Sequence, residues 1–208
     1  MKKSKRIFML VTILLSGLLA QSQTPSQNHK AMKKYYDQGD YVNATLKAMD
    51  YLRTNGRNKK AQKILSISFN MAVENVKSEI NDLMKRSKTF SGDETVTDRK
   101  KIISNYELLK KLDRKGREII MIIPKKKVSL KFEKINVSSE LETAQKSLAE
   151  SIKMAAAMHY NRGLNLMKKA GRESQKSAAI EFKNSEYYIP NYKDSKELYN
   201  ETRKKGTT

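Results

Sequence analysis

Apolar residues recur along most of the chain at the three- and four-residue spacing of amphipathic helices. The clearest pattern begins near Asn58 and continues without a break to about Lys88. Its apolar stripe consists of Ala61, Leu65, Phe69, Ala72, Val76, Ile80 and Leu83. Two shorter helices are predicted before it, over 29–38 and 41–54, with a turn at Gly39-Asp40. The first part of the chain is therefore predicted to be helical.

Four further helices are predicted in the second half of the chain. Their approximate expected ranges are 95–116, 138–169, 176–188 and 192–204. Ser138 or Ser139 would cap the longest of them, and Glu142 fits a capping box with these serines. Pro190 separates the last two, because proline does not continue a helix.

The segment 119–135 departs from the helical pattern. Ile119–Ile123 is a continuous apolar run that favours β structure. Val128, Leu130 and Phe132 then alternate with polar residues, which is the period of an extended chain. We expect an extended connector packed on the helical core, with a short hairpin as the alternative.

The N-terminus has the pattern of a secretory signal peptide. The basic stretch 1–6 precedes fourteen mostly apolar residues, 7–20, a run shorter than the roughly 20 residues of a membrane-spanning helix. Ala20 and Ser22 supply small residues for cleavage after Ser22, and cleavage after Ala20 is the second candidate. An uncleaved anchor and a buried helix are the alternatives. We expect removal of residues 1–22 and an exported, periplasmic or envelope-associated protein with no remaining transmembrane span.

Two parts of the chain resemble tetratricopeptide repeats, in which helix pairs recur about every 34 residues. The matching positions nearer the N-terminus are Tyr35, Gly39, Tyr41, Ala44, Ala61, Leu65, Ser66 and Phe69. Those nearer the C-terminus are Gly163, Leu166, Ala178, Phe182, Ser185 and Pro190. The layout is similar to that of exported or lipoprotein tetratricopeptide-like proteins of bacterial envelopes.

The resemblance implies an all-α fold of antiparallel helix pairs, with a long-helix insertion and a short extended connector. Three extra residues between Gly163 and Ala178, and the lack of a turn after Ala72, depart from the repeat. The expected segments are a signal peptide at 1–22, repeat-like helices at 28–90, a helix with the connector at 91–137, and repeat-like helices at 138–205.

Basic residues strongly outnumber acidic ones, with 43 Lys and Arg against 22 Asp and Glu and a formal net charge of +21. Loss of residues 1–22 would remove four basic residues and no acidic one, which leaves +17. Several basic doublets lie on predicted helices: Lys33-Lys34, Lys59-Lys60, Lys100-Lys101, Lys110-Lys111 and Lys168-Lys169. Such doublets are typical of solvated helix faces. The alternative is a surface that binds anionic lipid, glycan or extracellular DNA, with nucleic acid the least expected of these.

The residue types needed for catalysis or metal binding are sparse. The chain has no Cys, which excludes disulfides, thiolate metal sites, a Cys nucleophile and an acylated lipobox. Its two histidines, His29 and His159, lack metal-ligand spacing, and the chain has no Gly-x-Ser-x-Gly sequence. We expect His159 to be packed, and Asp93, Glu94 and Asp98 to act as caps and dipole partners at a helix start. The sequence therefore predicts no catalytic residue, metal ligand or cofactor, and the protein is not expected to be an enzyme.

Two tyrosine pairs, Tyr35-Tyr36 and Tyr187-Tyr188, lie on repeat-like helices. Neighbouring side chains on a helix point about 100° apart, so one member of each pair would pack while the other faces a groove. The candidate partner-binding residues are Tyr36, Tyr188, Lys33, Lys34 and Lys183. Packing of the tyrosines between helices is the alternative. The expected function is a non-catalytic scaffold that binds a protein or peptide in the bacterial envelope, and the alternative is a polyanion-binding envelope protein.

Overall fold

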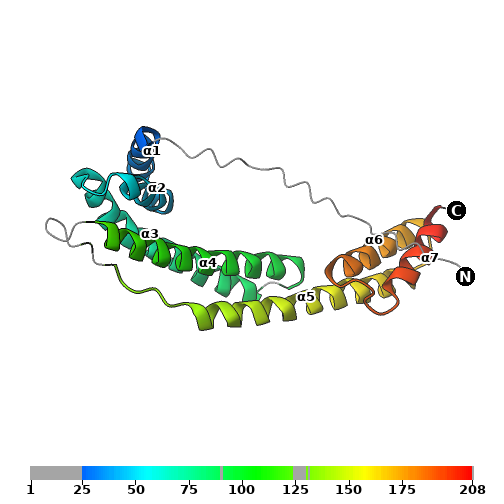
Figure 1. The fold of residues 1–208 in the computed structure, drawn as a ribbon. Helices are drawn as coiled ribbons and strands as arrows, with labels where there is room; N and C mark the ends of the chain where they lie inside the picture. Colours follow the sequence, from blue (N-terminus) through cyan, green and yellow to red (C-terminus); the bar gives the residue numbers. More distant parts are fainter. Residues whose placement is uncertain (1–24, 90, 124–129, 131, 208) are drawn as a thin grey trace, which may run out of the picture.

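The computed structural model describes residues 25–89, 91–123, 130 and 132–207, and within them the chain is all-helical, as predicted (Figure 1). The seven helices are α1 (Pro25–Asp37), α2 (Tyr41–Thr54), α3 (Lys59–Thr89), α4 (Asp93–Ile122), α5 (Ser138–Met167), α6 (Arg172–Tyr188) and α7 (Ser195–Thr207). The described residues contain no strand. The expected signal peptide, 1–22, lies outside the described residues.

A tight turn at Gly39 joins α1 to α2. The φ of Gly39 is +75°, in the left-handed region that glycine adopts without strain. Asp40 then caps α2, because its Oδ1 accepts a hydrogen bond from the backbone N–H of Asn43 at 3.1 Å. α2 packs against α1 and α3.

The strongest pattern in the sequence is confirmed by α3. Every residue of its predicted stripe, from Ala61 to Leu83, is at most 5% exposed. This stripe packs against α2 on one side and α4 on the other. Burial of a continuous stripe of this length is the main reason that the long helix is stable in the fold.

The prediction that the fourth helix ends near Gly116 and that Ile119–Ile123 is extended is wrong, since α4 continues to Ile122. Its buried face runs on through Gly116, Ile119 and Ile123 at helical spacing. Gly116 provides space there, because a Cβ atom would lie 3.1 Å from the ring of Phe132 and 3.3 Å from that of Phe69. The glycine permits close packing and does not end the helix.

The connector between α4 and α5 lies on the core in its described part, residue 130 and residues 132–137. Leu130, Ile135 and Val137 are buried, and Phe132 stacks on Phe69 with ring centroids 4.1 Å apart. The remaining positions of the expected period-two segment, including Val128, lie outside the described residues.

The start of α5 differs from the expected capping box. The residue before the helix is Val137, and no side chain caps the first turn. The hydroxyl of Ser139 donates to Glu140, while Glu142 forms an ion pair with Lys146. α5 packs against α4 and α6 along its length.

α6 and α7 also begin at other residues than expected. α6 starts at Arg172, before the expected 176. The expected start of α7 at 192 is wrong, because the turn before it has positive φ at Asn191 (56°) and Lys193 (52°), and the helix begins at Ser195.

Two apolar cores share α5. The N-terminal core extends from Met32 to Ala144 and involves α1 to α4 and the first part of α5. The C-terminal core is built around Tyr160, Ala178 and Phe182, from the later part of α5 and α6, with half-buried residues of α7. Figure 1 shows α5 running beside α4 at one end and beside α6 at the other, where α7 packs on α6. The change of core thus falls inside the expected 138–205 segment.

Candidate functional site

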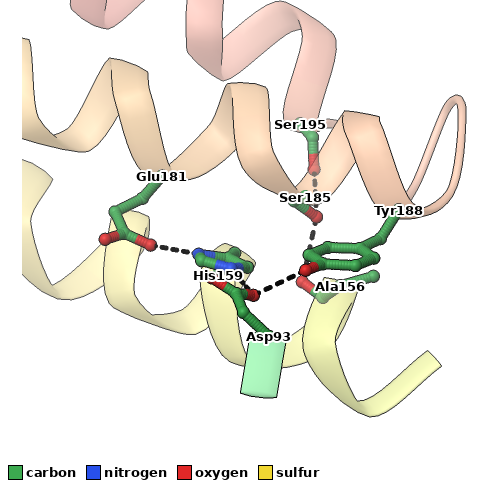
Figure 2. A network of polar contacts seen from close by, with 7 residues as sticks. All are labelled: Asp93, Ala156, His159, Glu181, Ser185, Tyr188 and Ser195. Carbon is green, nitrogen blue, oxygen red and sulfur yellow. Dashed lines mark hydrogen bonds and ion pairs between the residues drawn. The ribbon is translucent and has the colours of Figure 1, made fainter. Parts of the chain in front are cut away.

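A polar network centred on His159 lies where the two cores meet (Figure 2). The side chain of His159 is only 4% exposed, and each ring nitrogen faces a carboxylate. Nδ1 lies 2.6 Å from Oε2 of Glu181, and Nε2 lies 2.8 Å from Oδ1 of Asp93. The expected burial of His159 is confirmed, and its two acidic partners are additional.

The number of hydrogen bonds that His159 can donate in this network depends on its protonation state. A neutral imidazole carries one N–H and donates one hydrogen bond, whereas the imidazolium donates two. Donation to both Glu181 and Asp93 therefore requires the charged form of His159. The network places a buried imidazole between two carboxylates, of which Glu181 is 20% exposed and Asp93 is 57% exposed.

Tyr188 completes the network on the Asp93 side. Its hydroxyl donates to Oδ1 of Asp93 at 2.8 Å, and its ring stacks on His159 with centroids 5.7 Å apart. Burial raises the pKa of Asp93, but the hydrogen bonds from His159 and Tyr188 lower it by more, so that it lies below its ordinary value. Burial and the neighbouring Asp93 raise the pKa of Tyr188 to about 12. The phenol therefore remains a donor at neutral pH.

This network joins three helices. Asp93 stands at the start of α4, His159 lies in α5, and Glu181 and Tyr188 lie in α6. A further pair of hydrogen bonds connects α7: Ser195 donates to Ser185 at 3.2 Å, and Ser185 donates to the carbonyl of Ala156 at 2.9 Å.

The geometry suits a structural clasp better than catalysis. Both nitrogens of His159 are occupied by carboxylates, so neither is placed to accept a proton from a substrate. Asp93 and Glu181 lie on opposite sides of the ring and do not converge on one cation. No group of three or more acidic or histidine side chains suited to a metal occurs among the described residues.

The acids expected as helix caps have other partners. Asp93 is in the first turn of α4 but binds His159 and Tyr188. Asp98 is buried and accepts two hydrogen bonds from the guanidinium of Arg86, which lowers the pKa of Asp98. Sequence spacing could not reveal these partners, because they come from other helices.

Within the second tyrosine pair, the expected roles are reversed. Tyr188, expected to face a groove, stacks on His159, whereas Tyr187 is 76% exposed. Lys183 is exposed, as is Ile180 at 59%. Ile180, Lys183 and Tyr187 follow one another at three- and four-residue spacing and therefore share an outward face of α6. We call these three residues the α6 strip.

The candidates on α1 do not join this strip. Lys33 and Lys34 are exposed, and Lys33 forms an ion pair with Asp37. Tyr36 is half-buried with its ring edge against Tyr41 of α2, 5.9 Å between centroids. Figure 1 places α1 and α6 at opposite ends of the molecule, so the five candidate residues form two separate groups.

A second surface feature is a basic cleft of about 580 Å³ between α4 and the connector. Its cations without a carboxylate partner among the described residues are Lys110, Lys111, Arg114 and Lys134. Arg117 also lines it but is paired with the buried Asp113, which accepts a hydrogen bond from the backbone N–H of Ile135 at 3.0 Å. The doublet Lys110-Lys111, expected to be an ordinary solvated face, is thus part of a concave basic surface.

No protein-family model matches the chain, and no curated protein or solved structure matches it either. None of the described helices combines the length and apolar character needed to span a membrane.

Proposed function

We propose that the protein is a non-catalytic, exported helical scaffold that binds an acidic protein or peptide partner on the α6 strip. The observation that carries this proposal is the exposure of Tyr187 and Ile180 beside Lys183. Exposed aromatic residues beside a basic group are typical of protein-binding surfaces, because they supply apolar area and a directional charge. The net charge, +17 once residues 1–22 are removed, favours an acidic partner.

The order of helix contacts supports a repeat-like scaffold. α2 packs between α1 and α3, and α6 packs between α5 and α7. In tetratricopeptide-like arrays each helix contacts its neighbours in this sequential way. The signal-peptide pattern of residues 1–22 supports export to the envelope. N-terminal sequencing of the exported protein tests cleavage after Ala20 or Ser22.

Site-specific photocrosslinking in cells tests the proposed surface. A photoreactive phenylalanine analogue at Tyr187 should give a discrete adduct with an envelope protein. The same analogue at Ile67, an exposed apolar position on α3, is the matched control and should not. Absence of a discrete adduct at Tyr187, or equal adducts at both positions, would contradict binding on the α6 strip.

The basic cleft favours a second candidate function, binding of an anionic lipid or glycan. Four unpaired cations around one concavity attract a polyanion and release its counterions. Such binding weakens steeply with salt, whereas an interface anchored by apolar residues weakens less. Binding to phosphatidylglycerol vesicles and to heparin at low and high salt separates the two functions.

A further inference from the structure

A separate cleft of about 450 Å³ opens between the end of α3, the middle of α4 and the start of α5. Met84, Ile102 and Ala144 supply apolar surface, while Ser147 and Thr143 place hydroxyl groups along α5. Its size falls in the range of small-ligand sites, which are mostly apolar with a few convergent polar groups.

Arg99 lines this cleft without an acidic partner. Its Nε is enclosed and has no hydrogen-bond acceptor, and no carboxylate of the described residues forms an ion pair with it. By contrast, the guanidinium groups of Arg53, Arg86 and Arg117 are each paired with a carboxylate. A half-buried guanidinium that lacks an acceptor is costly, so it is a feature that a bound anion would stabilise.

Tyr106 places a second donor in the cleft. The residue is only 7% exposed, but its hydroxyl is not among the fully buried polar atoms that lack a partner, so a ligand or water in the cleft can reach it. It follows Arg99 by seven positions on α4, so both side chains lie on one face of the helix. Burial and the nearby Glu140 raise the pKa of Tyr106, which keeps its hydroxyl protonated and able to donate.

We propose that this cleft binds a small amphipathic carboxylic acid, with its carboxylate on Arg99 and Tyr106 and its apolar part on Met84, Ile102 and Ala144. The charges that line the cleft favour a single negative charge: Lys88 and Arg99 are cationic, and Glu140 is anionic. Glu140 would repel a dianion such as phosphate more strongly than a carboxylate. This inference does not depend on the proposed partner of the α6 strip.

Calorimetric titration of the chain lacking residues 1–22 with octanoate and with 1-octanol tests the site. Octanoate should bind with one-to-one stoichiometry, and 1-octanol about tenfold more weakly, because it lacks the anion that Arg99 requires. Arg99→Gln should lower the octanoate affinity about tenfold and Tyr106→Phe about threefold to tenfold, the usual worth of charge-assisted hydrogen bonds. Glu140→Gln should raise the affinity by removing the repulsive charge.

Lys100→Gln is the matched control, since it removes the same charge from the adjacent, exposed position of α4. It should leave octanoate affinity within about twofold. A tripeptide with a free C-terminal leucine and its C-terminal amide test whether a peptide end supplies the carboxylate. Tighter binding of the free-acid peptide than of octanoate, lost in the amide, would identify that source for the same chemistry.

Three results would overturn the proposal. They are no binding of octanoate or of the free-acid tripeptide, equal affinities for octanoate and 1-octanol, and equal losses of octanoate affinity in Lys100→Gln and Arg99→Gln. Misfolding is separable from loss of the site, because Tyr106→Phe removes only a hydroxyl that faces the cleft and should leave the melting temperature nearly unchanged. An Arg99→Gln or Tyr106→Phe protein that melts like the parent chain and binds octanoate with unchanged affinity would also contradict the assignment.

Discussion

Nε2 of His159 lies 2.8 Å from Oδ1 of Asp93, although 66 positions separate the two residues in the sequence. Because Asp93 begins α4 and His159 lies in α5 beside α6, this contact connects the helices of the N-terminal core to those of the C-terminal core. It makes the stability of the junction depend on a few polar groups.

Replacement of His159 by Gln should destabilise the fold by about 2–3 kcal/mol, because one change removes charge-assisted hydrogen bonds to both Glu181 and Asp93. Urea denaturation at neutral pH measures the loss. His29→Gln is the control, since His29 is half-buried, contacts the ring of Tyr51 and forms no ion pair with any described residue. Equal stability of the two variants would show that the hydrogen bonds of His159 to Glu181 and Asp93 contribute nothing to the free energy of unfolding.

The contribution of Asp93 should depend on pH. Burial raises the pKa of Asp93, but the hydrogen bonds from His159 and Tyr188 lower it by more, so that it lies below the ordinary value of 3.8. The charge of Arg162 lowers this pKa further. Glu181 is the other charged group of the network and contacts the opposite nitrogen of the imidazole. A lowered carboxyl pKa stabilises the fold above the unfolded-state value, and this contribution is lost as pH falls through the folded-state value.

Asp93→Asn should therefore be less stable than the parent chain at pH 6, with a smaller difference at pH 3. Denaturation curves at both values measure this. Asp82→Asn is the control, because Asp82 is largely exposed with only a 4.0 Å ion pair to Lys85. A difference that grows on acidification would have the wrong sign for the Asp93 contacts.

The two residues of the C-terminal tyrosine pair should respond oppositely to substitution. Tyr188→Phe removes the hydrogen bond to Asp93 and should cost about 0.5–1.5 kcal/mol of stability. Tyr187→Ala should leave stability within about 0.5 kcal/mol, because the side chain is exposed. Partner adduct formation, read from a photoreactive group at Ile180, should instead fall with Tyr187→Ala and persist with Tyr188→Phe. Loss of adduct with Tyr188→Phe alone would assign binding to the other tyrosine.

Phe182 should be among the most sensitive positions of the C-terminal core. It is fully buried, and Phe182→Ala should cost about 3–5 kcal/mol, the usual range for a core phenylalanine. Gly163→Ala should also destabilise, because the added Cβ would lie 2.7 Å from the Phe182 ring. Thermal melts measure both, with exposed Ile180→Ala on the same helix as the control. A smaller cost of Gly163→Ala in the Phe182→Leu background would identify this contact as the cause, and equal costs in both backgrounds would exclude it.

Neutralising the basic cleft should change the salt dependence of polyanion binding. The triple substitution of Lys110, Lys111 and Arg114 by Gln should reduce the slope of log affinity against log salt by roughly two to three units for a heparin ligand. The triple substitution of Lys59, Lys60 and Lys100 removes the same charge elsewhere and is the control. Equal reductions of the slope in both triple variants would mean that heparin binding depends on the overall charge of the protein and not on the cleft.

The elements that the sequence predicted well are those determined by local spacing. The α3 stripe from Ala61 to Leu83 is buried as a whole, because one helix face repeats every three or four residues wherever it packs. The local sequence around Gly116 predicts the end of a helix, but the role of this glycine depends on its contacts with Phe69 and Phe132, which are distant in sequence. Local propensity could not distinguish a stop from a close contact.

The candidate sites were less predictable for the same reason. Burial of His159 follows from its place beside an apolar stripe, but Asp93 and Glu181 come from other helices and carry no spacing signal. The choice between Tyr187 and Tyr188 required the helix phase to within one residue, an accuracy that apolar spacing alone does not supply. Arg99 and Tyr106 share a helix face, yet only the fold shows that both line one cleft and that Nε of Arg99 is enclosed there without an acceptor among the described residues.

The sharing of α5 between the two cores has a consequence for how the molecule comes apart. Leu141 and Ala144 of α5 belong to the N-terminal core, and Tyr160 of α5 belongs to the C-terminal core. A cut in the chain at either end of α5 would therefore separate one of the two cores from residues that it needs. Melting of either core therefore removes support from the helix on which the other is built. The protein is expected to unfold as one cooperative unit in spite of its two centres of packing.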